Sequence, residues 1–595
     1  MDDETRPIDT PAAATPAATP EPSPAATSEP ALATAATGGS PGRWLVAGGV
    51  AVVAVAVIIG ALLLFGRPTT STALQYIPGD AAIVGEIRMD LPGDQLQHVG
   101  NLLAHFPGFA DQSTLSTKMD EAMKRLLATD GQTGLDYVND VKPWLSGPGY
   151  FALMAPAGGT AVATGGHGVF SATTSGTASC EPVFRGQTTT HETYRGLDLT
   201  ESSAGTLACV LDGRQGLIGD TATVHLALDA KAAGSGIDKN AKYAAARTAL
   251  GLDRLATLYI SGDALSRLLP SASATPGSAD LTAVTGPIPD WTMMGVRAED
   301  ESLVVDSVTA PVVQPASGPS LLPLPATHPS VFAPMVPADT LVFAESQGAG
   351  VALQNLLSRL HALPELATAF QTLDGMGGPA QLVGWIDDAG VAVSMHGTTP
   401  YAALLIEATD EAGASSRVAA LGGLLVIAGG NGIQVTHSTI AGVAVTNVTI
   451  TDLRAFVPPG SVPGLTIPST GPISFSIAAH GKVIIVTSGE AAMTAILNVA
   501  AGSSLADDAT FRLAGQRGLA NSRTTVYVAA GAAIKLVQQV LPADQLATFT
   551  SNYLPYVAPL QAVSITATDD ANANRSRLVI GVTKPATPST PQATQ

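Results

Sequence analysis

Charged and aromatic residues are scarce in this 595-residue chain, at 13% and 5% of the sequence. Acidic residues outnumber basic ones by 48 to 29, which gives a formal net charge of -19. Because the few Lys and Arg residues form no cluster, the chain lacks a surface that would neutralise a run of phosphates. We therefore expect no nucleic-acid partner and a weakly charged surface made largely of Thr, Ser, Gly and Ala.

The common catalytic and metal-binding motifs are missing as well. The sequence has no GxxxxGK[ST] phosphate loop, no HExxH zinc motif and no GxSxG nucleophile elbow, and its 10 histidines stand singly. The run 570–574 begins like a calcium loop, but Arg575 takes the place of the required Gly. We expect no cofactor, no metal site and no catalytic residue, although an active site assembled from distant residues stays open.

Two acidic pairs, Asp80 with Glu86 and Asp339 with Glu345, are candidates for a catalytic acid and base. In each pair the Asp opens a predicted strand and the Glu stands six residues further along it. An extended strand would hold the two carboxylates about 15 to 20 Å apart, whereas glycosidases need roughly 5 to 10 Å. Each Asp, placed after a Pro, is better interpreted as a turn former.

Only two cysteines are present, Cys180 and Cys209. Neither has a second cysteine at CxxC spacing or a neighbouring histidine, which argues against redox or nucleophilic chemistry. Their location in one domain predicts a single disulfide formed in an oxidising compartment. Closing a loop of about 30 residues would add about 3 to 4 kcal/mol to stability. Two buried free thiols are the alternative.

The N-terminal region combines a polar tail with one long apolar run. Residues 1–42 are rich in Pro, Ala and Thr, so we expect a disordered tail. The run from Trp44 to Phe65 is uncharged and long enough to cross a hydrocarbon core of about 30 Å, and 43–67 is predicted to be a transmembrane helix in the lipid bilayer. Arg43 and Arg67 balance each other, but the cysteine pair favours a cytoplasmic tail and an extracytoplasmic bulk of the chain at the cell membrane.

The sequence also repeats. The stretch YIPGDAAIVGE at 76–86 returns as MVPADTLVFAE at 335–345, and further matching blocks follow in the same order, including Trp144 with Trp385. We interpret these tryptophans as core anchors rather than ligand platforms. The blocks predict two homologous units, 73–310 and 329–584, joined by a Pro-rich linker at 311–328 and followed by a disordered tail at 585–595.

Each unit is predicted to have an α+β fold, with a mainly antiparallel sheet and helices packed on it. Short apolar runs such as AAIVGEIRM, YFALMA, TLYIS, VAVSM and YAALLIEA follow one another with few helices between them. Apolar stripes at helical spacing predict helices over 96–106 and 115–127.

These segments resemble a known family. The apolar N-terminal run, then LQYIPGDAAIVGEIRMDL and LDYVNDVKPWLSGPGYFALM, is similar to the bacterial membrane-anchored family called domain of unknown function 3352, expected here over 73–584 as two diverged copies. In the second copy Val383 and Gly384 replace Lys142 and Pro143. The resemblance implies an extracytoplasmic α+β domain tethered by one helix, with no assigned activity.

Together these observations favour a single-pass membrane protein with a duplicated extracytoplasmic domain. Its expected role is non-catalytic, in binding or scaffolding at the cell envelope. The alternative is an envelope hydrolase with a dispersed active site.

Overall fold

The structure is a computed structural model that describes most of residues 72–583. All described residues belong to one compact unit, Val53–Gln595. The predicted tails, the apolar run 44–65 and most of the predicted helix 115–127 lie outside the described residues. Within 72–583 the gaps are 89–90, 92, 110, 112–116, 118–119, 122–123, 125–135, 145, 155–166, 186, 204, 252, 265–287, 312–321, 362, 364–365, 367–369, 372–373, 376, 397–398, 429–431, 452–471 and 570–572.

Among the described residues, none of the helices has both the length and the apolar character needed to cross a membrane.

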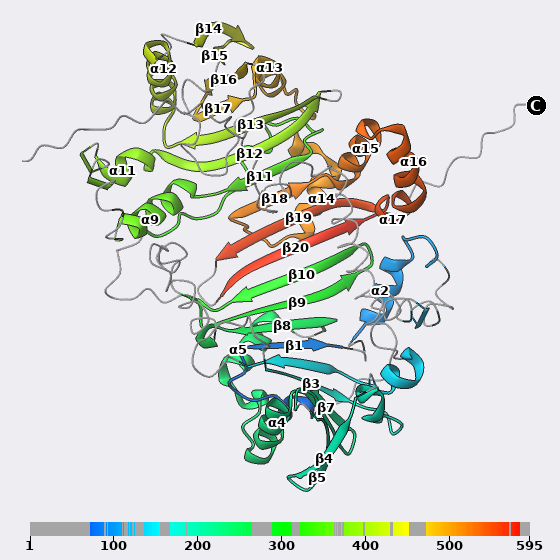
Figure 1. The fold of residues 1–595 in the computed structure, drawn as a ribbon. Helices are drawn as coiled ribbons and strands as arrows, with labels where there is room; N and C mark the ends of the chain where they lie inside the picture. The colour runs from blue at the N-terminus through cyan, green and yellow to red at the C-terminus, as the bar shows by residue number, and fades with distance from the viewer. Residues whose placement is uncertain are drawn as a thin grey trace, which may run out of the picture. The chain divides into compact units, whose positions relative to one another are not determined.

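The described part of the chain has a mixed α+β fold built on one 20-stranded sheet (Figure 1). Every strand pairing is antiparallel, and the pairings give the order β4-β5-β6-β7-β3-β2-β1-β8-β9-β10-β20-β19-β18-β11-β12-β13-β17-β16-β15-β14. The strands are β1 Ile83–Ile87, β2 Gly149–Leu153, β3 Gly168–Thr173, β4 Thr189–Tyr194, β5 Leu197–Ser202, β6 Ala208–Asp212, β7 Gln215–Gly219, β8 Ala256–Ser261, β9 Trp291–Glu299, β10 Ser302–Thr309, β11 Val342–Ser346, β12 Ile386–His396, β13 Thr399–Ala408, β14 Ile433–Ile440, β15 Val443–Ile450, β16 Ile473–His480, β17 Val483–Thr487, β18 Thr524–Val528, β19 Leu560–Asp569 and β20 Asn574–Val582.

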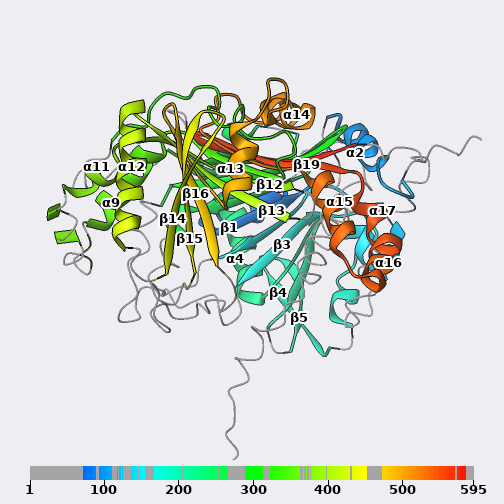
Figure 2. The same ribbon diagram turned by 90° about the horizontal axis from the view of Figure 1, so that it is seen from above.

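Helices stand between and beside these strands. In Figure 2, α9, α11 and α12 gather at one side of the sheet, and α15, α16 and α17 at the other. The α-helices are α2 Gln95–Leu103, α4 Thr221–Ala233, α5 Ala241–Leu250, α9 Ala349–His361, α11 Gly378–Val383, α12 Glu411–Ala428, α13 Glu490–Leu497, α14 Ala509–Arg517, α15 Ala530–Val540, α16 Ala543–Asn552 and α17 Leu554–Val557. The shorter helical turns are η1 Ala73–Tyr76, η3 Tyr137–Val141, η4 Lys142–Trp144, η6 Glu181–Phe184, η7 Ile237–Lys239 and η10 Leu505–Asp507.

The strand order has the same connectivity when it is followed inward from either end. β1 lies between β2 and β8, and β11 likewise lies between β12 and β18. The registers agree too, since Glu86 of β1 stands opposite Thr257 and Glu345 of β11 stands opposite Thr525. The two halves of the order meet where β10 pairs with β20.

Local sequence signals explain how the helices begin. The carboxylate of Asp220 accepts a hydrogen bond from the backbone N–H of Thr223 at the start of α4, and Asp508 does the same for Phe511 in α14. These caps satisfy backbone donors that have no partner inside the helix. Gly234 ends α4 with a φ of 65°, a left-handed conformation that suits glycine.

The segment that was predicted to be a linker is docked where the structure describes it. The backbone N–H of Leu322 donates to Oδ1 of Asn355 at 2.8 Å, and Nδ2 of Asn355 donates back to the carbonyl of Leu322 at 3.0 Å. This part of 311–328 therefore packs along α9.

Candidate functional site

The central strands give the sheet two distinct faces. Val84 and Glu86 in β1, and Phe343 and Glu345 in β11, are all buried. We call their side the covered face, because α5 and α14 lie over it: Tyr243 of α5 contacts Tyr259, and Phe511 of α14 contacts Phe343. The opposite side is called the open face. Since side chains alternate along a strand, every second residue points to it.

Two neighbouring rows of apolar side chains cross the open face, in register over the eight strands from β9 to β13. At the usual strand spacing each row spans about 30 Å. The first row is Val296, Val305, Leu578, Ile565, Val526, Ala344, Val391 and Leu404. The second row is Ala298, Leu303, Ile580, Val563, Val528, Val342, Val393 and Ala402.

The first row remains accessible. Every side chain in it is at least partly exposed, and Val391, Leu404 and Ile565 are 43%, 41% and 40% exposed. The strands β9, β10, β20 and β19 lie side by side in Figure 1, with the helices at their margins. Phe151, which is 37% exposed, extends the apolar surface onto β2. Contiguous exposed apolar surfaces are uncommon on soluble domains, and they often mark the sites where ligands, membranes or other proteins bind.

A mixed row borders the first apolar row on its other side, with four hydroxyl side chains beside Met294, Ala567, Ala389 and Ile406. Ser307, Ser576, Thr524 and Ser346 stand two residues along their strands from first-row positions, and all four are partly exposed. The open face therefore offers an apolar band beside uncharged hydrogen-bonding groups, which matches an amphiphilic ligand.

Apolar clusters close the two ends of the open face. At the β7 end, Phe184 of η6 packs with Trp144 and Cys209. At the β17 end, Ala414 of α12 packs with Ile477 and Ile484. Along the side, residues of α2 such as Leu102 pack with Leu303. The accessible part of the face thus lies between these borders.

Both predicted disulfide residues belong to the β7-end border. Cys180 and Cys209 are joined, with an S–S distance of 2.03 Å and a Cα–Cα distance of 5.7 Å. Cys180 precedes η6 and Cys209 lies in β6, so the bridge ties this turn to the sheet.

The two recurring tryptophans lie at the two ends of the sheet. Trp144 is buried, and its indole N–H donates to the carbonyl of Ser179 at 3.3 Å. Trp385 is partly buried against the α12 cluster, and the guanidinium of Arg417 lies 4.4 Å from its ring centroid. Both rings therefore pack against their neighbours as anchors.

The structure separates the members of each acidic pair. Asp80 and Asp339 are exposed, whereas Glu86 and Glu345 are buried. Glu86 has a full set of partners that the sequence did not reveal: the Tyr150 hydroxyl donates to it at 3.0 Å, and the Thr257 hydroxyl at 3.2 Å.

Arg247 of α5 also pairs with Glu86. Beside them lies a cavity of about 220 Å³, lined by Glu86, Arg88, Arg247, Gly251, Asp253, Arg254 and Thr257. Burial raises the pKa of Tyr150, and the Glu86 carboxylate adds to that shift.

A second cavity of about 550 Å³ lies between α15, α17 and the β18 end of the sheet. Its lining is mixed, with Ile534, Leu554 and Leu560 beside Asp339 and Lys535. Its described lining contains no His, Cys or Ser, so it offers no imidazole base, thiol or serine hydroxyl.

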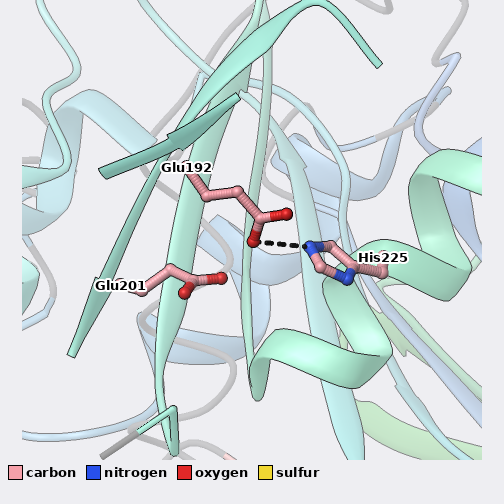
Figure 3. A group of neighbouring side chains, drawn as sticks. All are labelled: Glu192, Glu201 and His225. Atoms are coloured by element: carbon pink, nitrogen blue, oxygen red, sulfur yellow. Dashed lines mark ion pairs between the residues drawn. The ribbon is translucent and has the colours of Figure 1, made fainter. Parts of the chain in front are cut away.

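Two groups of side chains in the described residues have the spacing of a metal site. The first is Glu192 of β4, Glu201 of β5 and His225 of α4, which point toward one another in Figure 3. Nε2 of His225 lies 3.5 Å from a carboxylate oxygen of Glu192, and its ring stacks on Tyr194 at 3.8 Å. All three side chains are at least partly exposed.

The second group is His328, Asp388 and Glu407. Burial raises the pKa of the Asp388 carboxyl, and burial followed by the nearby Asp388 charge raises that of Glu407. The hydrogen bond from His328 to the carbonyl of Pro329 raises the imidazole pKa. No motif in the sequence indicates this group, because its members come from three separate segments.

Comparisons with known proteins identify the family. The model of the family described as "Protein of unknown function (DUF3352)" matches residues 43–581. It does so once, in a single span over both halves of the sheet, rather than as the two copies that were expected. No curated protein matches the chain.

Three crystal forms of TP0453 are similar at 8%, 9% and 13% sequence identity, with TM-scores of 0.21, 0.20 and 0.20. The matches cover 40%, 41% and 44% of this chain, and 80%, 79% and 92% of the other. Scores this low support no argument about this protein. Because the family model spans most of the chain, the chain belongs to the DUF3352 family of proteins of unknown function.

Proposed function

We propose that this chain is a membrane-tethered protein of the cell envelope that binds amphiphilic lipids on the open face of its sheet, without catalysis. The observation that carries the proposal is the pair of apolar rows, in register over eight strands and bordered by hydroxyl side chains. Acyl chains would lie along the apolar rows, and the polar part of the lipid would meet the hydroxyl groups of Ser307, Ser576, Thr524 and Ser346.

The anchoring and the topology are part of the same proposal. The uncharged run 44–65 would form a single transmembrane helix, with the tail in the cytoplasm and the sheet outside. The family match begins at residue 43 and so includes this run. The bond between Cys180 and Cys209 supports an oxidising, extracytoplasmic location.

We also infer that the two halves of the sheet arose by duplication. The repeated sequence blocks, the matching connectivity and the shared Glu-to-Thr register of β1–β8 and β11–β18 support this inference. Duplication would explain the length of the open face, because pairing β10 with β20 joins two smaller apolar surfaces into one.

The residues that line the two cavities support a role without catalysis. The described linings of both lack His, Cys and Ser, which a dispersed hydrolase site would be expected to use. The 220 Å³ cavity holds a Glu86–Arg247 pair whose members already bind each other. An envelope hydrolase is therefore the weaker of the two hypotheses.

The proposal is tested with full-length chain kept soluble by an amphipathic polymer. Bound lipid is extracted and quantified by mass spectrometry in the unmodified chain and in the double variant Val391→Asn/Ile565→Asn. Removing two apolar contacts of about 1 kcal/mol each should weaken lipid binding by roughly tenfold or more.

The matched control is Val540→Asn on α15, which changes a valine that is 57% exposed but lies off the open face. It should retain as much lipid as the unmodified chain. A chain that carries no lipid, or equal lipid in all three proteins, would reject the open face as the binding site.

A further inference from the structure

The group His328, Asp388 and Glu407 gathers side chains from three segments. His328 precedes β11, Asp388 lies in β12 where the register with β13 shifts between Ile386 and Ala389, and Glu407 lies near the end of β13. One ligand atom from each residue lies within 4.8 Å of the other two. Nε2 of His328 is 3.3 Å from Oδ2 of Asp388. Ligand atoms around one small cation are separated by comparable distances.

Asp388 supplies an independent sign that something is bound here. Its side chain is 0% exposed. Oδ1 accepts a hydrogen bond from the backbone N–H of Gly348 at 2.9 Å, but Oδ2, which faces His328, has no hydrogen-bond donor among the described residues. A buried carboxylate oxygen without a donor is costly, and such atoms are rare unless a water or an ion satisfies them.

Glu345 is a second buried acid that has a carboxylate oxygen without a hydrogen-bond partner among the described residues. It is 4% exposed, and the oxygen in question is Oε1. The charges of Asp388 and His328 both act on it. Two buried carboxylates thus stand close together in one corner of the covered face.

Glu86, the equivalent residue in the other half of the sheet, has partners that Glu345 lacks. Glu86 has the same register as Glu345 and is neutralised by Arg247, the seventh residue of α5. The seventh residue of α14 is Gly515, so the position equivalent to Arg247 carries no charge. Tyr150, which donates to Glu86, stands opposite it in β2, whereas Gly390 stands opposite Glu345 in β12.

Two further protein cations act on this group. The charge of Arg523 acts on Asp388, and that of Lys482 acts on Glu407. However, Nη2 of Arg523 donates to the carbonyl of Pro325 at 2.9 Å, and its Nε lies 3.4 Å from Asp569. Nη1 of Arg523 is buried without a hydrogen-bond partner among the described residues, and no ion pair there joins Arg523 to Asp388, so Oδ2 of Asp388 receives no direct bond from this cation.

We propose that His328, Asp388 and Glu407 bind a divalent transition-metal cation of the zinc or manganese type. One imidazole nitrogen with two carboxylates suits these ions, whereas calcium and magnesium prefer sites made only of oxygen. The cation would supply the positive charge that Arg247 supplies near Glu86. It would also fasten the segment before β11 to β12 and β13. Because His328 is 38% exposed, water can complete the coordination.

The test uses the full-length chain in the amphipathic polymer, stripped of metal by a chelator and titrated separately with Zn²⁺ and Mn²⁺ in a calorimeter. One ion should bind per chain. His328→Gln and Glu407→Gln should each weaken that binding by about tenfold or more, since each removes a direct ligand. His361→Gln is the matched control, because His361 belongs to another exposed pair, 3.0 Å from Asp374, and should leave the affinity unchanged.

A readout that needs no variant accompanies the titration: X-ray absorption of the zinc-loaded chain should show one imidazole together with carboxylate oxygens. Binding only at millimolar metal, or a ligand set without imidazole, would overturn the proposal. So would binding that survives both substitutions but is lost in Glu192→Gln, since that result would place the ion at the Glu192, Glu201 and His225 group.

Discussion

Single charged residues hold distant parts of this weakly charged chain together. Asp212 in β6 accepts a hydrogen bond from the hydroxyl of Tyr76 at 2.7 Å and pairs with Lys231 of α4. The ammonium of Lys231 also lies 4.8 Å from the ring centroid of Tyr76. Three elements, η1, β6 and α4, thus meet at one carboxylate. The hydrogen bond from Lys231 is the main reason that the pKa of Asp212 lies below its usual value of 3.8.

This depressed pKa predicts how stability depends on pH. The Asp212 contribution is present above the unfolded-state pKa near 3.8 and is lost as the pH falls through the lower folded-state value. Asp212→Asn should therefore lower the free energy of unfolding by about 1 kcal/mol at pH 7, a figure reduced for solvent screening, and the difference should be smaller at pH 3, below the unfolded-state pKa. Denaturant unfolding at the two pH values measures it.

The exposed Asp80→Asn serves as the control for that experiment, and its stability should follow that of the unmodified chain at both pH values. An Asp212→Asn deficit that stays constant from pH 7 to pH 3 would show that the side chain stabilises by packing rather than by charge.

At the scale of single elements, sequence patterns identified most of the buried strands. Runs such as TLYIS and YAALLIEA became β8 and β13, because apolar residues fill both faces there, and the stripe over 96–106 became α2 Gln95–Leu103. The strands β3, β4, β5, β9, β14, β15, β16 and β19 were missed. In β4 the residues THETY are largely exposed and carry no apolar alternation, whereas β5 and β9 do hold buried residues that the sequence patterns did not identify.

The candidate site was harder to predict than the strands. The open face depends on which strands are neighbours and in which register, and Val305 meets Leu578 only because β10 pairs with β20. The proposed metal ligands are equally non-local, since His328 and Glu407 are far apart in sequence. Glu86 can be buried because Arg247 pairs with it, and Arg247 lies on a helix far away in the sequence. Local periodicity contains none of this information.

The disulfide element gives a prediction about stability. Cys180→Ser/Cys209→Ser should lower the free energy of unfolding by about 3 kcal/mol, because the bridge closes a loop in the unfolded chain. Thermal unfolding should show a lower midpoint for this part of the chain. Reductant should lower the midpoint of the unmodified chain to that of the double variant and leave the double variant unchanged. Two titratable thiols in the unmodified chain would contradict the bridge.

At the scale of the whole described molecule, the pairing of β10 with β20 unites the two halves of the sheet. Eight residue pairs connect these strands. Asp306, which is buried in β10, binds Arg577 of β20 at 2.7 Å, and Arg254 and Arg297 approach it at 3.1 and 3.3 Å. A buried carboxylate surrounded by three guanidinium groups favours this junction over a slipped register. Because β10 pairs with β20 along its whole length, the open face continues from one half of the sheet to the other.

Photochemical labelling can locate acyl chains on the open face, where we propose that they bind. Full-length chain is loaded with a fatty acid that carries a diazirine in its acyl chain, irradiated and digested, and the labelled residues are located by mass spectrometry. We expect labels on first-row residues such as Val391, Ile565 and Leu578, and their loss when excess unlabelled lipid competes. Labels confined to the 550 Å³ cavity beside Lys535, or spread evenly over exposed helices such as α15, would contradict this proposal.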